Sequence, residues 1–181
     1  MVRGRTGVAG ALLVGGASTR FGSAKALARY EGETLAERAH RVLAEAFDEV
    51  IVVGKAADGL ELPFEVLDDG SDVRASMVGV AAALRLADAE VVVVLPTDMP
   101  LVTADLLRAL ADAAGGHDAA VPQTGPFPGA YRRTALPVLE RRIASGDYAL
   151  HQALGELRAR VVELDEAALR NVNEPAGLDG L

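Results

Sequence analysis

The run Val91 to Leu95 constrains the fold more than any other segment, because every residue in it is apolar. An unbroken apolar run is typical of a central strand in a parallel sheet whose two faces are both covered. Parallel strands need crossover connections, and amphipathic segments lie between the apolar runs of this chain. The sequence therefore predicts an α/β fold, a three-layer Rossmann-like sandwich around a mostly parallel central sheet.

The other segments continue this alternation of strands and helices. A capping box, Thr34-x-x-Glu37, begins the helix expected from Thr34 to Phe47. Thr103 is the expected N-cap of a helix ending at Ala114. The remaining expected helices are Met77–Leu86, Thr134–Ser145 and Ala149–Leu157, and the expected strands are Val8–Val14, Val50–Val53, Phe64–Leu67, Val91–Leu95, Ala119–Pro122, Gly129–Arg132 and Val161–Leu164. No repeat or linker interrupts the series, so residues 1–181 are expected to form one domain.

Composition limits the classes of function. The formal net charge of −8 disfavours sequence-independent binding of nucleic acid, because such binding depends on Lys and Arg neutralising phosphates. The chain has no cysteine, which excludes disulfides, thiolate nucleophiles and cysteine metal sites and fits a reducing cytoplasm. No apolar run approaches the ~20 residues of a membrane span. We therefore expect a cytoplasmic protein that binds neither membranes nor nucleic acid.

A glycine-rich loop follows the first expected strand. Residues 13–25 read Leu-Val-Gly-Gly-Ala-Ser-Thr-Arg-Phe-Gly-Ser-Ala-Lys, so Arg20 and Lys25 share one loop with Gly15 and Gly16. Successive backbone N–H groups in such a loop form a concavity for anions, at the sheet edge where α/β proteins bind nucleotides. The spacing fits neither a P-loop nor the dinucleotide fingerprint. The loop is either a polyphosphate site or an ordinary strand-to-helix turn.

Two further polar segments are candidates for a metal site. Asp98 follows the Val91–Leu95 strand at the edge that also carries the glycine loop. Mg²⁺ prefers one or two carboxylates together with phosphate oxygens and water, so Asp98 is a candidate ligand. Asn173 offers a neutral oxygen that can join it. The alternatives are a Pro-bounded turn at Asp98 and a helix N-cap at Asn173.

Asp69 belongs to the segment Asp68-Asp69-Gly70, which follows the strand expected from Phe64 to Leu67. A carboxylate at this point can accept hydrogen bonds from the N1–H and 2-amino groups of guanine. Asp-Asp-Gly is equally a favourable turn sequence. The residues alone leave both interpretations open.

Taken together, these segments resemble the molybdenum cofactor guanylyltransferases. That family begins with a Leu-Ala-Gly-Gly-x-Ser-x-Arg-Met-Gly-x-Asp-Lys loop, which residues 13–25 match in most positions. It carries Asp-x-Pro after a central strand, matched by residues 98–100, and Asn-x-Asn-x-Pro near its C-terminus, matched by residues 171–175. The segment 126–133 is similar to the family's Pro-Leu-x-x-x-Tyr-Arg strand. The likeness covers residues 7 to 178.

The resemblance implies the nucleotide-diphospho-sugar transferase fold and a nucleotidyltransferase that joins GMP from GTP to the phosphate of molybdenum-molybdopterin, releasing pyrophosphate. It implies Mg²⁺ as cofactor, and transient contacts with the enzymes that make or receive the cofactor. Carried over to this chain, Lys25, Asp98 and Arg20 would be catalytic, and Asp98 and Asn173 would hold the metal. The nucleotide-binding residues would be Leu13, Val14, Gly15, Gly16, Ser18, Lys25, Asp69 and Asp98.

The chain departs from the family pattern at four places. Ala24 replaces the Asp before the loop lysine, and Phe21 replaces Met. Residues 75–79, Ala-Ser-Met-Val-Gly, replace Gly-Pro-Leu-x-Gly near the base, and Val53-Gly54 stand where the family often shows Asn. The departures leave three alternatives: transfer from another nucleotide such as CTP, transfer to another acceptor such as a sugar phosphate, or a non-catalytic cofactor-binding relative.

Overall fold

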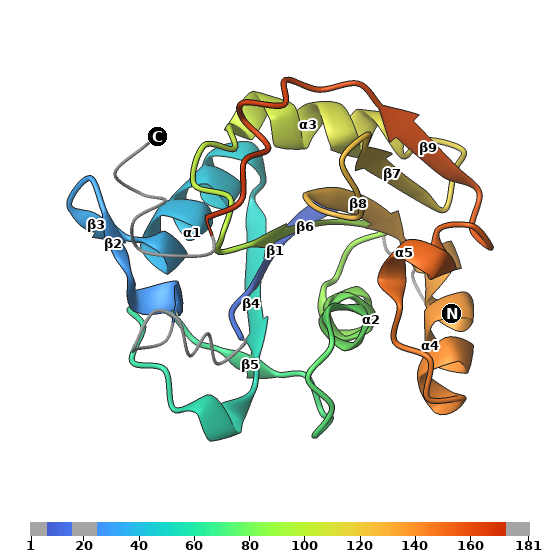
Figure 1. Ribbon diagram of the computed structural model, residues 1–181, viewed down its shortest axis with the longest axis horizontal. Coiled ribbons are helices and arrows are strands. Elements are labelled where there is room, and N and C mark those ends of the chain that lie inside the picture. Colours follow the sequence, from blue (N-terminus) through green and yellow to red (C-terminus); the bar gives the residue numbers. More distant parts are fainter. Residues whose placement is uncertain (1–6, 16–24, 173–181) are drawn as a thin grey trace.

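The computed structural model describes residues 7–15 and 25–172. Its secondary structure alternates strands and helices along the chain (Figure 1). The elements, in chain order, are β1 Val8–Leu13, η2 Lys25–Leu27, β2 Arg29–Tyr30, β3 Glu33–Thr34, α1 Leu35–Ala46, β4 Glu49–Gly54, η3 Ala56–Asp58, β5 Leu67–Asp68, α2 Ser76–Leu86, β6 Val91–Pro96, α3 Ala104–Ala113, β7 Ala119–Pro122, β8 Gly129–Arg132, η4 Arg133–Ala135, α4 Leu136–Ala144, α5 Leu150–Ala153 and β9 Ala159–Val162.

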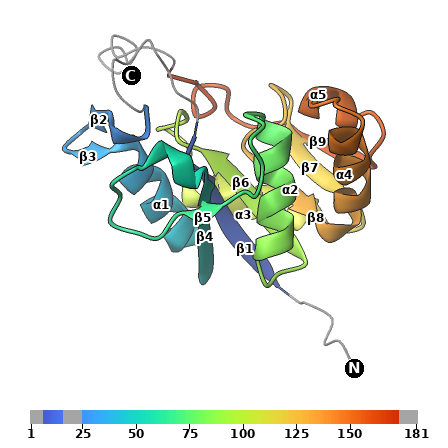
Figure 2. The same ribbon diagram turned by 90° about the horizontal axis from the view of Figure 1, so that it is seen from below.

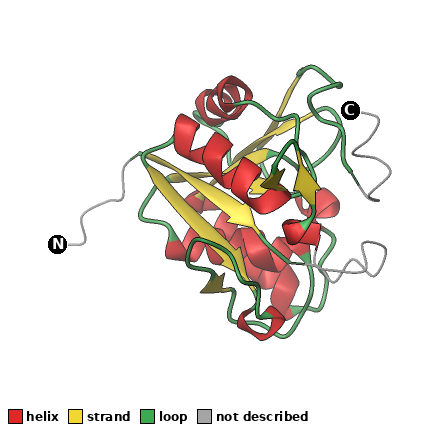
Figure 3. Ribbon diagram, turned by 90° about the vertical axis from the view of Figure 1, so that its left-hand side faces the viewer, coloured by secondary structure: helices red, strands yellow, loops and turns green. Residues whose placement is uncertain are grey.

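Within the described residues, the main sheet has seven strands in the order β5-β4-β1-β6-β8-β7-β9. All neighbours pair in parallel except β8, which runs antiparallel to both β6 and β7. Helices α1 and α3 cover one face of the sheet, and α2 and α4 cover the other (Figures 1 and 2). Figure 3 shows helices on both sides of the strands. The expected three-layer α/β fold with a mostly parallel sheet is confirmed.

Each face of the sheet has its own hydrophobic core, and the central strands contribute to both. In β6, Val92 and Val94 pack on the α2 side, and Val93 and Leu95 pack on the α1 and α3 side. All four are at most 1% exposed. Because both faces of β6 are buried, its sequence shows no polar alternation. Among the described residues, no helix is long and apolar enough to cross a membrane.

Local signals in the sequence located the helix starts correctly. Thr34 caps α1 through the expected capping box with Glu37, and the Thr103 hydroxyl accepts from the backbone N–H of Leu106 at 3.3 Å. The last expected helix is shorter than predicted: the expected range was Ala149–Leu157, and α5 covers only Leu150–Ala153.

Two expected strands lie elsewhere than predicted. The strand expected at Phe64–Leu67 is Leu67–Asp68, because the Phe64 ring stacks on His40 of α1 with ring centroids 4.4 Å apart. The strand expected at Val161–Leu164 is Ala159–Val162, and the backbone of Leu164 pairs instead with the Gln123 side chain.

The β2–β3 hairpin was not predicted. Its strands have two residues each, which is too short for a periodic signal, and its turn places both Glu31 and Gly32 at positive φ.

The register between β1 and β6 decides which loops meet. Leu12 lies opposite Leu95, and Leu13 lies opposite Pro96. The glycine loop after β1 and the segment Thr97-Asp98 after β6 therefore leave the sheet at the same edge. Strand β4 ends beside them, where the Val14 N–H donates to the Val53 carbonyl at 2.9 Å.

Gly54 gives a stability test of this close approach. A Cβ at this position would lie far inside van der Waals distance of the Val14 carbonyl oxygen and 2.9 Å from Val14 Cγ2. Because a backbone oxygen cannot move aside cheaply, Gly54→Ala should lower the free energy of unfolding by roughly 1–3 kcal/mol, as overpacking does. Chemical denaturation measures this change.

Gly15→Ala is the matched control at the same edge, because a Cβ there meets nothing within 4 Å among the described atoms. Its unfolding free energy should stay close to that of the unaltered protein. Equal stability of the two variants would show that β1 and β4 do not approach as closely as described.

Candidate active site

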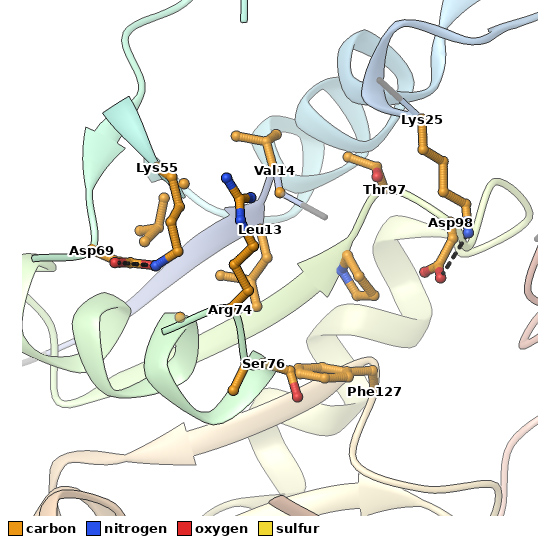
Figure 4. Close-up of a pocket in the computed structure, with 16 residues that line it drawn as sticks. Leu13, Val14, Lys25, Lys55, Asp69, Arg74, Ser76, Thr97, Asp98 and Phe127 are labelled. Carbon is orange, nitrogen blue, oxygen red and sulfur yellow. Dashed lines mark hydrogen bonds and ion pairs between the residues drawn. The ribbon is translucent and has the colours of Figure 1, made fainter. Parts of the chain in front are cut away.

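A cleft of about 420 Å³ opens at the sheet edge where β1, β4 and β6 end (Figure 4). Its floor is made by the ends of these strands. One wall is the segment that enters α2, and Phe127 contributes from the loop before β8. The lining residues are Leu13, Val14, Gly15, Lys25, Val53, Gly54, Lys55, Asp69, Arg74, Ala75, Ser76, Gly79, Pro96, Thr97, Asp98 and Phe127. The cleft therefore draws on segments from residue 13 to residue 127.

Lys25 and Asp98 form an ion pair at one side of this cleft. Lys25 Nζ lies 3.2 Å from Asp98 Oδ2, and the two side chains are 14% and 24% exposed. The second oxygen, Oδ1, is buried and has no hydrogen-bond partner within the described part of the chain. A buried carboxylate oxygen left without a partner is costly, and a bound cation would satisfy it.

The donor set fits Mg²⁺ better than a cation that needs a complete protein cage. Mg²⁺ takes one or two carboxylates and completes its shell with water and phosphate oxygens. Within residues 7–15 and 25–172, no group of three or more His, Asp or Glu side chains could hold a metal ion. A cation at Asp98 would therefore share its coordination with a phosphorylated substrate.

The loop that carries Asp98 is held by two distant segments. Nε of Arg38, on α1, donates to the Pro100 carbonyl at 2.7 Å. The backbone N–H of Val172 donates to the Asp98 carbonyl at 2.8 Å. These bonds fix the backbone on both sides of Met99, so the Asp98 carboxylate is presented from an anchored loop.

A second ion pair, between Lys55 and Asp69, lies at the other side of the cleft (Figure 4). Lys55 Nζ donates to both carboxylate oxygens, at 2.8 and 2.7 Å, and to the Ser71 carbonyl at 2.6 Å. Asp69 Oδ1 also accepts from the Ser71 N–H at 3.0 Å. The side chains of Lys55 and Asp69 are 10% and 8% exposed, so this pair is more withdrawn from water than Lys25 and Asp98.

Asp68 shapes the turn that presents Asp69. Its carboxylate accepts from the backbone N–H groups of Ala56 and Gly70, each at 2.7 Å. These backbone hydrogen bonds, that from Ala56 foremost, lower the pKa of Asp68. Gly70 takes φ +75°, a conformation that favours glycine. The segment is thus a turn, as one interpretation of the sequence expected, and its second carboxylate lines the cleft.

The wall that enters α2 adds one more cation. Arg74 donates to both carboxylate oxygens of Asp58 and lines the cleft two residues before α2 begins. The nearby guanidinium lowers the pKa of Asp58. Ala75, the N-cap of α2, makes no side-chain cap, and its carbonyl accepts from the backbone N–H of Val78 at 3.1 Å.

The structure brings six of the predicted site residues to one cleft. Leu13, Val14, Gly15, Lys25, Asp69 and Asp98 all line it. The predicted residues Gly16, Ser18, Arg20 and Asn173 lie outside the described residues. Their roles stay predictions.

Sequence reasoning missed Lys55, Arg74, Phe127 and Arg38. Lys55 directly follows a strand that ends at the ligand-binding edge, so the rule that selected Asp98 would also have selected it. Arg38 carried no such signal, because its contact with Pro100 joins segments 62 residues apart.

Comparison with known proteins identifies the class of this site. Residues 10–161 match the family model described as the MobA-like NTP transferase domain. The protein belongs to this family. It is accordingly a nucleotidyltransferase, and the cleft at the sheet edge is its candidate active site.

Three similar proteins illustrate the relationship. A protein of Opitutus terrae named "Probable molybdenum cofactor guanylyltransferase" is 34% identical over 95% of this chain and 93% of its own. The crystal structure of molybdopterin-guanine dinucleotide biosynthesis protein A from Archaeoglobus fulgidus has a TM-score of 0.80 and 26% identity over 94% of this chain and 95% of that one. A Thermus thermophilus 2-C-methyl-D-erythritol 4-phosphate cytidylyltransferase has a TM-score of 0.72 at 22% identity, covering 93% and 94%. The expected nucleotide-diphospho-sugar transferase fold is confirmed.

The Asp98 oxygen that has no hydrogen-bond partner among the described residues leads to a testable prediction. Asp98→Asn keeps the shape of the side chain but removes its charge, so the protein should bind Mn²⁺ more weakly. The loss should exceed the ~10–100-fold that follows removal of an outer-shell partner of a metal site. Titration followed by electron paramagnetic resonance of free Mn²⁺ measures the affinity.

Asp105→Asn serves as the control, because that carboxylate is 95% exposed on α3. It should bind Mn²⁺ as the unaltered protein does. Unchanged Mn²⁺ affinity in Asp98→Asn would remove Asp98 as a ligand.

Proposed function

We propose that this protein transfers GMP from GTP to the phosphate of molybdenum-molybdopterin and releases pyrophosphate. The observation that carries the proposal is the meeting of Lys25 and Asp98 beside the end of β1. The names of similar proteins support molybdopterin as acceptor and guanine as base. The cytoplasmic location expected from the sequence belongs to the same proposal.

The chemistry is an in-line displacement at phosphorus. A phosphate oxygen of the acceptor forms a bond to the α-phosphorus of GTP, and the bond from that phosphorus to the bridging β-oxygen breaks. The nucleophile is already ionised, so the protein needs no side chain to activate it. Catalysis then depends on positioning and on neutralising the charge that moves to pyrophosphate.

Different residues of the cleft would position the phosphates and neutralise their charge. The Gly15 backbone leaves room for phosphates, because no described atom lies within 4 Å of where its Cβ would be. Lys25 supplies positive charge beside them, and Asp98 supplies the carboxylate oxygen for a cation. Mg²⁺, when bound there, would neutralise phosphate charge. Gly16, Ser18 and Arg20 extend the phosphate site, and Asn173 assists Asp98, as the family resemblance implies.

Asp69 is the proposed reader of guanine. Its carboxylate lines the cleft on the side away from Lys25 and Asp98, which suits a base joined to the triphosphate through ribose (Figure 4). A buried acceptor matches the N1–H and 2-amino donors of guanine.

Pyrophosphate release tests the proposal. The purified protein is incubated with each of the four ribonucleoside triphosphates, with Mg²⁺, and with or without molybdopterin. GTP with molybdopterin should give the fastest release. Lys25→Met and Asp98→Asn should each lower the rate by about 10²-fold or more, as loss of one preorganised charge typically does.

Glu90→Gln is the matched control for these variants. It also breaks an ion pair, with Arg132, but at the opposite edge of the sheet, where Val91 pairs with Arg132. Its rate should be that of the unaltered protein. Fastest release from CTP, or with a sugar phosphate as acceptor, would replace the proposed substrates. Binding of GTP without any release would point to a cofactor carrier.

A further inference from the structure

Lys55 and Asp69 form a donor and an acceptor side by side within one binding cleft. Nζ of Lys55 contacts both oxygens of Asp69 at 2.7–2.8 Å, and neither side chain is more than 10% exposed. Taking two charges out of water is costly even when they pair, and such a pair is weak evidence of a stabilising role. Its place in the lining of a nucleotide cleft points to a role in binding.

The hydrogen bonds of the pair leave capacity for a ligand. Within the described residues, Oδ2 of Asp69 accepts only from Lys55, whereas Oδ1 accepts from Lys55 and from the Ser71 N–H. Nζ of Lys55 has three N–H donors, and one is held by the Ser71 carbonyl. If Nζ shifts from both carboxylate oxygens to one, a third donor and a carboxylate lone pair become available together.

Guanine carries the complementary pattern on one edge. Its O6 accepts a hydrogen bond, and the adjoining N1–H and 2-amino groups donate. We propose that Lys55 is a second base-reading residue, whose ammonium group donates to O6 while Asp69 accepts from N1–H and the 2-amino group. This inference rests on the proposed guanylyl transfer.

The same hydrogen-bonding pattern would exclude adenine and cytosine. Adenine presents an amino group where guanine has O6, so two donors would face each other at Lys55. Adenine and cytosine both present a ring-nitrogen lone pair where guanine has N1–H, so two acceptors would meet at Asp69. A site with buried polar groups discriminates strongly, because the wrong base leaves those groups unpaired.

Equilibrium binding tests this role without any turnover. GTP, inosine triphosphate and 6-thio-GTP compete with a fluorescent GTP analogue on the unaltered protein, Lys55→Met, Asp69→Asn and the control Arg132→Met. Inosine triphosphate lacks the 2-amino group, and 6-thio-GTP replaces O6 with a weaker acceptor. Thermal melting confirms that each variant is folded.

Lys55→Met should weaken GTP by roughly tenfold to a hundredfold, the range expected for loss of a hydrogen bond to a charged donor. Its preference for GTP over 6-thio-GTP should fall toward one, and its preference for GTP over inosine triphosphate should persist. Asp69→Asn should show the opposite, losing the preference that depends on the 2-amino group. Arg132→Met, which also loses an ion pair, should keep both preferences.

Two results would overturn the role of Lys55. Equal weakening of all three nucleotides in Lys55→Met would assign it a structural task only, and unchanged affinities would assign it none. If Lys55→Met fails to fold with Asp69 unpaired, the double variant Lys55→Met/Asp69→Asn is compared with Asp69→Asn, since both lack the carboxylate charge. Failure of the unaltered protein to bind GTP at all would instead sink the proposed function, which separates the two failures.

Discussion

The parallel pairing of β1 with β6 is the constraint on which the candidate site depends. Because Leu13 lies opposite Pro96, the glycine loop and Asp98 leave adjacent strands at the same edge, although Lys25 at the end of that loop is 73 residues from Asp98 in the sequence. Burial of both strands on two faces fixes this register, since a slip by one residue would exchange the two cores. The packing of valines and alanines in the sheet thereby determines where a triphosphate can meet a carboxylate.

Electrostatics within the cleft are local and differ from the charge of the whole chain. The protein carries a formal charge of −8, yet Lys25, Lys55 and Arg74 all line the cleft, each paired with an acidic side chain. Pairing keeps these cations in place before a ligand arrives, and hydrogen-bond donors that are already oriented lose less entropy on binding. Such a cleft offers cations to a polyphosphate although the chain as a whole is acidic.

The sequence was sufficient for the parts of the fold that local rules govern. The unbroken run Val91–Leu95 indicated a doubly covered strand, and Thr34 and Thr103 indicated helix starts, because burial and capping act within a few residues. Asp98 was found by its place after a strand. Local rules could not predict contacts between distant segments. One such contact is the stacking of Phe64 on His40, beside the strand that lies elsewhere than predicted. Another is the hydrogen bond from Arg38 to Pro100, which anchors the loop that carries Asp98. Predicting the Lys55–Asp69 pair would have required the register between β4 and β5, which places Val53 opposite Leu67.

The end of β4 gives a physical reason for one departure from the family pattern. The family that this chain resembles often shows Asn where this chain has Val53-Gly54. In this structure a side chain at position 54 would collide with the Val14 backbone. In this structure the first residue after β4 able to extend a polar group is Lys55, and that group reaches Asp69. The close approach of β1 and β4 thus moves the polar function one position along the chain. If Lys55 reads the base as proposed, base recognition in this protein uses a cation at this position.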